Sequence, residues 1–459
     1  MNTKRITALI FAAVMAFSSV IGAYAANESE SISANNLIAE ENFPELHTDY
    51  YMLADLDTGR VLYSKNADKR IYPASTTKIL TGIMTLENCK LSDVVVATNE
   101  AIDPINMNHS NMGILVGEEL TVEQLLYGML IHSANDAANV LAVHMAGSLS
   151  DFADMMNSRA RNLGATNTHF TNAHGFHEAD HYTTIADLAQ ITAYAMKNET
   201  FAEIVSQSKY QIPPTNKYHE TRYLSSTNMM LSNNRTSMHL FKYALGVKTG
   251  STNEAGNCLV AAADKNGTRL MSIVMKCKNE GVESGAYSFT DSRALLDFGF
   301  DNYKHITVSS LSDIVAASKV REAKDGIRVA LSPETELKVL LPKSTALAMI
   351  KKDVTIEPNI KAPIKKGDIL GEVTYSLNDE ILGTVKLVAG NAVERDVLLH
   401  IFYTIWGLIT DPIVIIAIIL IIFMAVYIKR RRNHRRKMRR RNLRNFQEDF
   451  YDDDDYYDM

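Results

Sequence analysis

Tyr72-Pro73-Ala74-Ser75-Thr76-Thr77-Lys78 leads directly into a run with helical periodicity, Thr76 to Glu87. Pro73 suits the start of that helix, so the side chains of Ser75 and Lys78 are predicted to project from one face of its first turn. A serine hydroxyl is a nucleophile only when a base takes its proton, and a lysine whose pKa is lowered by burial and a second cation is such a base. The helix N-terminus adds backbone N–H donors for an oxyanion. Alone, Ser-x-x-Lys is a weak motif, because these residues are also common caps.

Two further elements strengthen the interpretation of Ser-x-x-Lys. Ser133-Ala134-Asn135 lies between two helical segments and supplies a hydroxyl and an amide from a loop. Lys248-Thr249-Gly250 ends an apolar strand, where the glycine allows a substrate backbone to approach the strand edge and the lysine adds positive charge. Each element alone is common in loops, but the three together, in this order and in these contexts, form a specific sequence pattern.

The order of predicted elements favours an α+β domain, with an antiparallel sheet built from both chain ends around a helical insert. Two strands joined by a turn at Asp57-Thr58-Gly59 come first, and helices then fill the middle of the domain before three more strands. The strands are expected at Tyr50 to Leu56, Arg60 to Ser64, Ala244 to Thr249, Cys258 to Ala263 and Leu270 to Met275. The helices are expected at Thr76 to Glu87, Val122 to Leu130, Asp136 to Met145, Phe152 to Leu163 and Ile185 to Lys197.

The sequence resembles the low-molecular-mass penicillin-binding proteins that act as serine D-alanyl-D-alanine carboxypeptidases. The resemblance rests on the three elements above and implies a serine β-lactamase/penicillin-binding-protein-like domain, then a small all-β domain and one transmembrane helix. Further matching segments are Leu56-Asp57-Thr58-Gly59, Asn66-Ala67-Asp68, Leu120-Thr121-Val122-Glu123, Asp136-Ala137-Ala138, Tyr182-Thr183-Thr184 and Gly246-Val247.

The resemblance implies a role for each catalytic residue. Ser75 would attack the carbonyl between two terminal D-alanines, and Lys78 would be its general base. Ser133 would relay a proton to the leaving amine, while Asn135 would hold the substrate amide. Water would hydrolyse the acyl-enzyme, and β-lactam antibiotics would acylate the same serine.

The resemblance also assigns the substrate-binding strand. Lys248 would supply positive potential, Thr249 would bind the terminal carboxylate, and Gly250 would leave room for the substrate backbone. The backbone N–H groups of Ser75 and Ser251 would form the oxyanion hole. Arg235 is either a further partner of the carboxylate or a solvated surface residue.

Three functions stay open at this point. The first is removal of the terminal D-Ala from peptidoglycan stem pentapeptides. The second is a D,D-endopeptidase or weak β-lactamase activity of the same residues, although the sequence has no E-x-x-L-N element of the kind that class A β-lactamases use for deacylation. The third is a catalytically silent, penicillin-binding wall sensor.

His177-Glu178-Ala179-Asp180-His181 matches H-E-x-x-H, a zinc-protease motif that needs both histidines on one helical face. Gly175 precedes it, no apolar stripe surrounds it, and the next helix begins only near Thr184. The segment is therefore predicted to be a loop, no metal or cofactor is expected, and His132 and His174 are interpreted as structural.

The two ends of the chain carry membrane signals. Residues 1–25 have the pattern of a secretory signal peptide, and residues 26–46 are polar and predicted to be a flexible lead-in to a catalytic domain at 47–303. Short β-rich runs predict an all-β domain at 304–395, followed by an interfacial amphipathic segment at 396–411. Residues 412–428 contain no charge from Ile413 onward and are predicted to cross the membrane as a helix.

The predicted location is the cell membrane, with one span, the catalytic body outside and a basic, then acidic, tail at 429–459 inside. The formal net charge of −6 hides this division, because 34 basic and 46 acidic residues lie between Ala26 and Ile428. Such an acidic body disfavours nucleic acid as a partner, and membrane lipid is expected to meet only the C-terminal anchor. The three cysteines Cys89, Cys258 and Cys277 are too few for a disulfide framework and are interpreted as packing residues.

Overall fold

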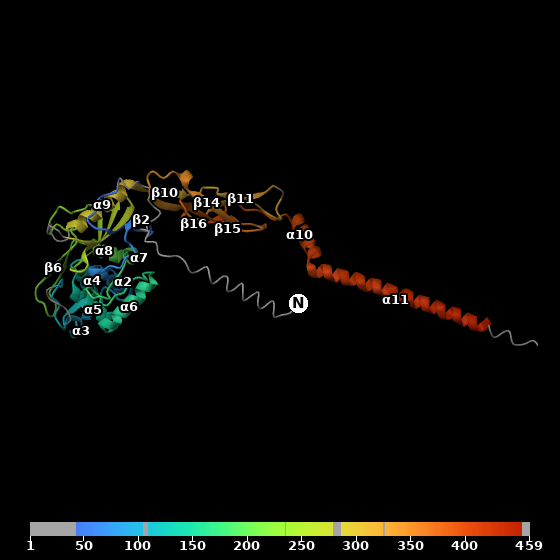
Figure 1. Cartoon of the computed structure of the whole chain (residues 1–459), viewed down its shortest axis with the longest axis horizontal. Coiled ribbons are helices and arrows are strands. Elements are labelled where there is room, and N and C mark those ends of the chain that lie inside the picture. Colours follow the sequence, from blue (N-terminus) through green and yellow to red (C-terminus); the bar gives the residue numbers. More distant parts are fainter. Residues whose placement is uncertain (1–42, 104–108, 235, 279–285, 325, 452–459) are drawn as a thin grey trace, which may run out of the picture. The chain divides into compact units, whose positions relative to one another are not determined.

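A computed structural model describes residues 43–103, 109–234, 236–278, 286–324 and 326–451. The predicted signal peptide at 1–25 and most of the predicted lead-in lie outside these residues. The described chain divides into two compact units (Figure 1). Unit 1 is the described part of Met1–Ile306 together with Leu340–Thr345, and unit 2 is that of Thr307–Val339 and Ala346–Met459.

A five-stranded antiparallel sheet organises unit 1, with the strand order β2-β1-β9-β8-β7. Strands from the start of the domain therefore pair with strands from its end, which confirms the predicted α+β arrangement. The strands are β1 (Tyr50–Asp55), β2 (Val61–Lys65), β7 (Ala244–Thr252), β8 (Gly256–Lys265) and β9 (Thr268–Cys277).

The insert between β2 and β7 is mostly helical, and Thr121 and Gln124 form a capping box at the start of α4. Its helices are η2 (Ala74–Thr77), α2 (Lys78–Asn88), α3 (Asn99–Ile102), α4 (Val122–Leu130), α5 (Asn135–Ala146), α6 (Leu149–Asn162), α7 (Ile185–Ala195) and α8 (Glu199–Ser206). Two small strand pairs accompany them, β3 (Val94–Val96) with β4 (Glu119–Thr121) and β5 (Lys209–Ile212) with β6 (Arg222–Ser225).

The sheet separates two hydrophobic cores because successive side chains of a strand point to opposite faces. On β1, Met52 and Ala54 belong to the core formed with the helices of the insert, whereas Tyr51 and Leu53 belong to the core beneath α9 (Ala286–Asn302). Figure 1 shows α9 on the opposite side of the sheet from α2, α4 and α5. Helix α9 was not predicted from the sequence, because buried polar residues interrupt its apolar pattern.

The end of the predicted lead-in is part of the folded body. The ring of Phe43 stacks on Tyr63 with centroids 4.0 Å apart and meets the edge of Phe298 at 5.2 Å. Leu46 packs against the same core. Burial of these apolar groups fixes this stretch, whose polar composition alone suggests flexibility.

Unit 2 contains a five-stranded antiparallel sheet in the order β11-β12-β16-β15-β14, so the predicted all-β architecture is confirmed. The strands of this part of the chain are β10 (Tyr303–Ser309), β11 (Ala316–Lys319), β12 (Arg328–Pro333), β13 (Leu337–Pro342), β14 (Lys351–Ile356), β15 (Ile369–Leu377) and β16 (Glu380–Ala389), with the short helix η3 (Leu347–Met349). Strands β10 and β13 pair with each other.

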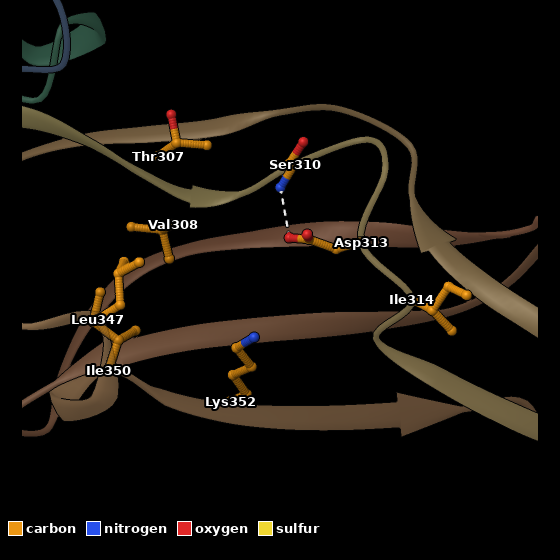
Figure 2. A pocket seen from close by; sticks show the side chains of 8 residues that line it. All are labelled: Thr307, Val308, Ser310, Asp313, Ile314, Leu347, Ile350 and Lys352. Atoms are coloured by element: carbon orange, nitrogen blue, oxygen red, sulfur yellow. Dashed lines mark hydrogen bonds between the residues drawn. The ribbon is translucent and has the colours of Figure 1, made fainter.

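Figure 2 shows a cavity of about 390 Å³ within unit 2. Apolar side chains such as Val308, Ile314 and Ile350 line it together with Lys352 and Asp313, whose carboxylate accepts a hydrogen bond from the Ser310 N–H at 2.9 Å. None of the predicted site residues lines this cavity.

The three cysteines are free thiols, and Cys258 and Cys277 are buried on the neighbouring strands β8 and β9. Asn257, and not Cys258, stands opposite Cys277 in the register of β8 and β9. The two thiols therefore fill space in the cores.

Two helices follow unit 2's sheet, α10 (Val397–Thr410) and α11 (Pro412–Tyr451), and α11 is apolar only as far as Ile428. Asp396 and Asp411 cap them, since their carboxylates accept hydrogen bonds from the first backbone N–H groups of each helix. His400 Nδ1 lies 2.7 Å from Glu322 Oε2 and ties α10 to the preceding part of unit 2. Helix α11 continues past Ile428 through the basic run, and among the described residues only Pro412–Asn442 is long and apolar enough to cross a membrane.

Candidate active site

Ser75 lies in a 3₁₀ turn, η2, and the α-helix begins only at Lys78, which corrects the predicted α-helical start. Threonine hydroxyls tighten the turn, because Thr76 Oγ1 donates to the Pro73 carbonyl at 2.6 Å and Thr77 Oγ1 to the Ala74 carbonyl at 2.9 Å. Side chains three residues apart are aligned in a 3₁₀ turn. Ser75 and Lys78 therefore still share one face.

Lys78 is fully buried, and its amine makes three contacts. Nζ donates to Asn135 Oδ1 at 2.7 Å and to the His174 carbonyl at 2.7 Å, and it lies 3.0 Å from Ser75 Oγ. A neutral amine has two hydrogens and one lone pair. With both hydrogens held by Asn135 and His174, the lone pair is left facing the serine hydroxyl.

The electrostatics favour that neutral amine. Burial lowers the pKa of Lys78 well below its usual value, the positive charge of Lys248 lowers it further, and Asp136 acts in the opposite direction. Burial also lowers the pKa of Lys248, to about 7. Two buried amines close to one another disfavour a proton on both.

Ser133 lies at the end of the loop before α5, where its hydroxyl contacts Lys248. Its φ of 67° lies in the left-handed region, which is a strained conformation for a serine and typical of functional sites. Lys248 Nζ donates to Ser133 Oγ at 2.9 Å and to the Thr249 carbonyl at 3.0 Å. The loop before α5 and the strand β7 are thus joined by the hydrogen bond between Ser133 and Lys248.

Strand β7 is an edge strand of the sheet, with η2 beside it. A Cβ on Gly250 would lie 3.1 Å from the backbone nitrogen of Ser75, so glycine lets the strand and the serine turn approach closely. Thr249 Oγ1 lies 2.5 Å from Thr227 Oγ1, and Ser251 is exposed. A hollow of about 170 Å³ adjoins this place and is lined by Thr227, His132 and further hydroxyl-bearing residues.

A buried carboxylate anchors the start of α5. Asp136 accepts hydrogen bonds from the backbone N–H groups of Met112 and Ile114 at 3.0 to 3.1 Å, and Asn135 N donates to the Ser110 carbonyl at 2.9 Å. The segment before β4 therefore holds the position of Asn135.

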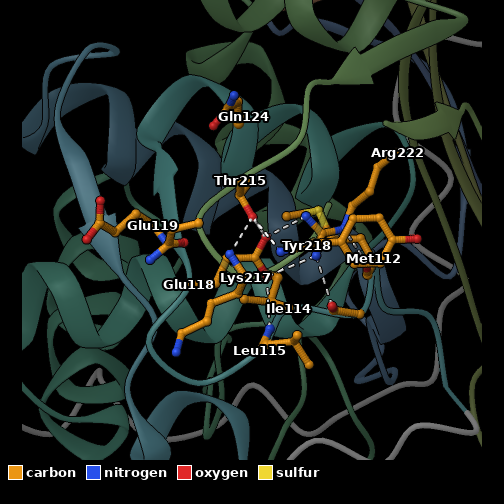
Figure 3. Close-up of polar contacts among 12 residues, drawn as sticks. Met112, Ile114, Leu115, Glu118, Glu119, Gln124, Thr215, Lys217, Tyr218 and Arg222 are labelled. Carbon is orange, nitrogen blue, oxygen red and sulfur yellow. Dashed lines mark hydrogen bonds and ion pairs between the residues drawn. The ribbon is translucent and has the colours of Figure 1, made fainter. Parts of the chain in front are cut away.

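A buried ion pair fixes that segment in turn (Figure 3). Arg222 donates to Glu118 at 2.6 and 2.9 Å and to the carbonyl of Met112 at 3.0 Å, and Thr215 Oγ1 donates to Glu118 at 2.6 Å. Burial alone would raise the pKa of Glu118, but the hydrogen bonds from Arg222 and Thr215 outweigh it and lower the pKa. The pair connects the β5–β6 hairpin to the loop that supports Asn135.

The structure brings together Ser75, Lys78, Ser133, Asn135 and Lys248, with Thr249 and Gly250 on the adjacent strand. Arg235 lies outside the described residues. Several residues near the site were not predicted, namely Thr77, Glu118, Asp136, Arg222 and Thr227. Their signals are weak in sequence, since each is a common polar residue whose partner is distant along the chain.

The H-E-x-x-H segment is a loop, as predicted, and α7 begins after its N-cap Thr184, whose side chain accepts from the Asp187 N–H. The described residues contain no group of three His, Cys, Asp or Glu side chains placed to hold a metal ion. His181 is buried and His174 contributes its backbone carbonyl to Lys78.

Comparisons with known proteins agree with this geometry. Residues 37–279 match the family model described as D-alanyl-D-alanine carboxypeptidase, and residues 303–395 match the C-terminal domain of penicillin-binding protein 5. The chain is 31% identical over 350 residues to D-alanyl-D-alanine carboxypeptidase DacF of Bacillus subtilis, which covers 75% of this chain and 85% of the relative.

Solved structures give the same result. Penicillin-binding protein 5 of Haemophilus influenzae superimposes with a TM-score of 0.62 at 26% identity, covering 77% of this chain and 99% of that one. The Streptomyces K15 DD-transpeptidase superimposes with a TM-score of 0.51 at 33% identity, covering 56% of this chain and 99% of that one. The chain belongs to the D-alanyl-D-alanine carboxypeptidase family of penicillin-binding serine peptidases.

The buried ion pair between Glu118 and Arg222 should contribute to stability. Arg222→Met leaves the Glu118 carboxylate buried without its partner, so the free energy of unfolding of unit 1 should fall by about 3–5 kcal/mol. Lys65→Met breaks the exposed pair with Asp49 and should cost less than about 1 kcal/mol. Calorimetric unfolding of the full chain measures both.

The pH dependence of the free energy of unfolding tests the same ion pair independently. A carboxylate with a lowered pKa stabilises the fold above its unfolded pKa, and that stability is lost as the pH falls through its folded pKa. Glu118→Gln should therefore lose less stability than the wild type on acidification. Equal losses in the two proteins would contradict the assigned ion pair.

Proposed function

We propose that this protein is a serine D-alanyl-D-alanine carboxypeptidase that removes the terminal D-Ala from peptidoglycan stem pentapeptides. The proposal rests on the position of the Lys78 amine. Its nitrogen lies 3.0 Å from Ser75 Oγ and donates hydrogen bonds to Asn135 Oδ1 and to the His174 carbonyl. A lysine held in this way is placed to act as a base toward one hydroxyl. The family membership supplies the substrate class.

The reaction begins with acylation of Ser75. Neutral Lys78 accepts the hydroxyl proton as Ser75 Oγ attacks the carbonyl between the two D-alanines. The backbone N–H groups of Ser75 and Ser251 donate to the oxyanion that forms. Support for this hole comes from Gly250, which allows β7 to lie close to the Ser75 nitrogen.

Collapse of the tetrahedral intermediate needs a proton on the leaving amine. Ser133 relays it, since its hydroxyl accepts a hydrogen bond from Lys248 at 2.9 Å and faces the same place. Asn135 donates its amide N–H to the substrate while its oxygen stays with Lys78. Thr249 binds the terminal carboxylate, and the charge of Lys248 attracts it.

Water then hydrolyses the acyl-enzyme and releases the shortened stem peptide. A β-lactam presents an amide carbonyl of the same kind, so it acylates Ser75 and remains attached when hydrolysis is slow. A carboxypeptidase is favoured over an endopeptidase because Thr249 and Lys248 form a site suited to a free carboxylate. A silent penicillin-binding sensor is disfavoured, because binding alone does not require Lys78 beside Ser75.

Ser75→Ala should abolish covalent labelling by a fluorescent penicillin and release of D-alanine from a pentapeptide ending in D-Ala-D-Ala. The variant removes the only atom that forms the acyl bond. Ser158→Ala, at an exposed position on α6, is the matched control and should label stoichiometrically. Both are measured on the full chain in detergent.

Assays with different substrates distinguish the three possible enzyme activities. Release of D-alanine from the free pentapeptide identifies a carboxypeptidase, whereas cleavage of cross-linked dimers alone identifies an endopeptidase. Rapid turnover of the penicillin identifies a β-lactamase. A folded wild-type protein that is not labelled would reject every acyl-enzyme function.

We infer that α11 anchors the protein in the cell membrane, with the body outside and the tail inside. Residues 412–428 would span about 25 Å as a helix, slightly less than a hydrocarbon core of ~30 Å. Helix α10, with its exposed apolar residues and Trp406, supplements this length at the interface. The basic run from Lys429 favours the cytoplasmic side.

Protease added to intact spheroplasts should digest the penicillin-labelled body and leave an epitope tag after Met459 protected. The basic run makes this orientation favourable, and detergent lysis should expose the tag. Immunoblotting of both ends measures it. A tag that is digested in intact spheroplasts would contradict the proposed topology.

A further inference from the structure

The residue before the proposed nucleophile has a strained backbone. Ala74 has φ +48°, in the left-handed region that alanine rarely adopts, and its side chain is buried. Such a conformation persists only when the surroundings hold it. Because the turn sets where Ser75 Oγ points, whatever holds Ala74 also aims the serine.

Two neighbours enclose the Ala74 carbonyl. Thr77 Oγ1 donates to it at 2.9 Å. Gly175 lies so close that a Cβ there would be 1.8 Å from the same oxygen. The carbonyl is thus held by a hydroxyl of its own turn and by the backbone of the loop that contains the H-E-x-x-H segment.

His181, the last residue of that segment, continues this chain of hydrogen bonds. Its Nδ1 lies 3.0 Å from the backbone nitrogen of Thr171, and a backbone N–H only donates, so Nδ1 is the acceptor. The proton of the neutral imidazole is therefore on Nε2. This nitrogen lies 2.9 Å from Thr77 Oγ1 and donates to it, which leaves the Thr77 hydroxyl proton for Ala74.

The surroundings keep the ring neutral. Burial lowers the pKa of His181 to about 3, with His169, His177 and Lys78 adding to the effect. A second proton would have to sit on Nδ1, directly against the Thr171 N–H. Both ring nitrogens are thus engaged in hydrogen bonds within the protein.

The same loop is attached on the other side of Ser75. The Ala173 carbonyl accepts from Thr81 Oγ1 at 2.6 Å, and the His174 carbonyl accepts from Lys78 Nζ at 2.7 Å. The loop thus contacts the residue before the nucleophile and the base after it. A shift of the loop would alter the geometry between Ser75 and Lys78.

We propose that His181 is a positioning residue for the acylation of Ser75, acting through the Thr77 hydroxyl on the Ala74 carbonyl. The proposal rests on Ser75 being the nucleophile proposed above. His181 touches neither substrate nor the reacting atoms, so it should affect the rate of acylation and leave noncovalent binding of the antibiotic unchanged.

Stopped-flow acylation of the full chain by a fluorescent penicillin separates these two quantities. Thr77→Val removes the hydroxyl and should lower the acylation rate constant about 10- to 100-fold, with the noncovalent dissociation constant within about threefold of wild type. Thr77→Ser retains the hydroxyl and should restore the rate. Thr85→Val removes another buried hydroxyl of α2, which donates to the Thr81 carbonyl of the same helix, and should acylate normally.

The link to His181 is tested by a double-mutant cycle. His181→Phe removes the donor and should produce a loss similar to Thr77→Val, with no further loss in the double variant. His181→Gln, which keeps an N–H donor, should acylate faster than His181→Phe. Additive losses, wild-type acylation by Thr77→Val, or no rescue by Thr77→Ser would overturn the proposal.

NMR of the wild type tests the hydrogen bonds without any variant. Long-range ¹H–¹⁵N spectra at pH 7 should show His181 neutral with the proton on Nε2, and a charged ring or an Nδ1–H tautomer would overturn the proposal. This result does not depend on activity. If the wild type is not labelled at all, the proposed function fails while the spectra still decide the state of His181.

Discussion

Two lysine side chains, Lys78 and Lys248, are buried almost completely in one site, and the rest of the arrangement follows from that constraint. Removing an ammonium group from water is costly, and a second buried cation makes it more so. Hydrogen-bond acceptors around each amine offset part of this cost. The remaining cost favours the neutral form, and a lysine that has lost its proton can act as a base. The fold must therefore hold Ser75, Ser133 and the carbonyls around them within hydrogen-bond distance of these two amines.

The architecture satisfies this requirement by bringing distant segments together. The sheet carries Lys248 on its edge strand β7, and the helical insert carries Lys78 at the start of α2 and Asn135 at the start of α5. Two layers of fixed groups support them. Asp136 and the Glu118–Arg222 pair hold the loop near Asn135, while the loop from Thr171 to His181 holds the turn of Ser75.

Much of this was predictable from sequence where the signal is local. Helix α4 has the predicted bounds, the predicted strands pair as expected, and the three short elements converge in one place. The long-range polar contacts were not predictable, because nothing near Arg222 in the sequence points to Glu118. Equally, threonine hydroxyls bond within the 3₁₀ turn at Ser75 and a buried histidine contacts one of them, whereas helical periodicity reports only on apolar burial. Helix α9 was missed for the same reason, since polar residues such as Asp291 lie buried on it.

The protonation state of Lys78 decides whether its amine can act as the base, and NMR of the enzyme carrying ¹³C- and ¹⁵N-labelled lysine measures it directly. The Lys78 resonance is assigned by its loss in Lys78→Arg, and its Cε shift is followed as the pH is raised. We expect the amine to titrate well below the ordinary value of 10.5 and to be largely neutral in the pH range where acylation is fast. Titration near 10.5, with the amine still charged while Ser75 is acylated, would contradict the assignment of Lys78 as the base.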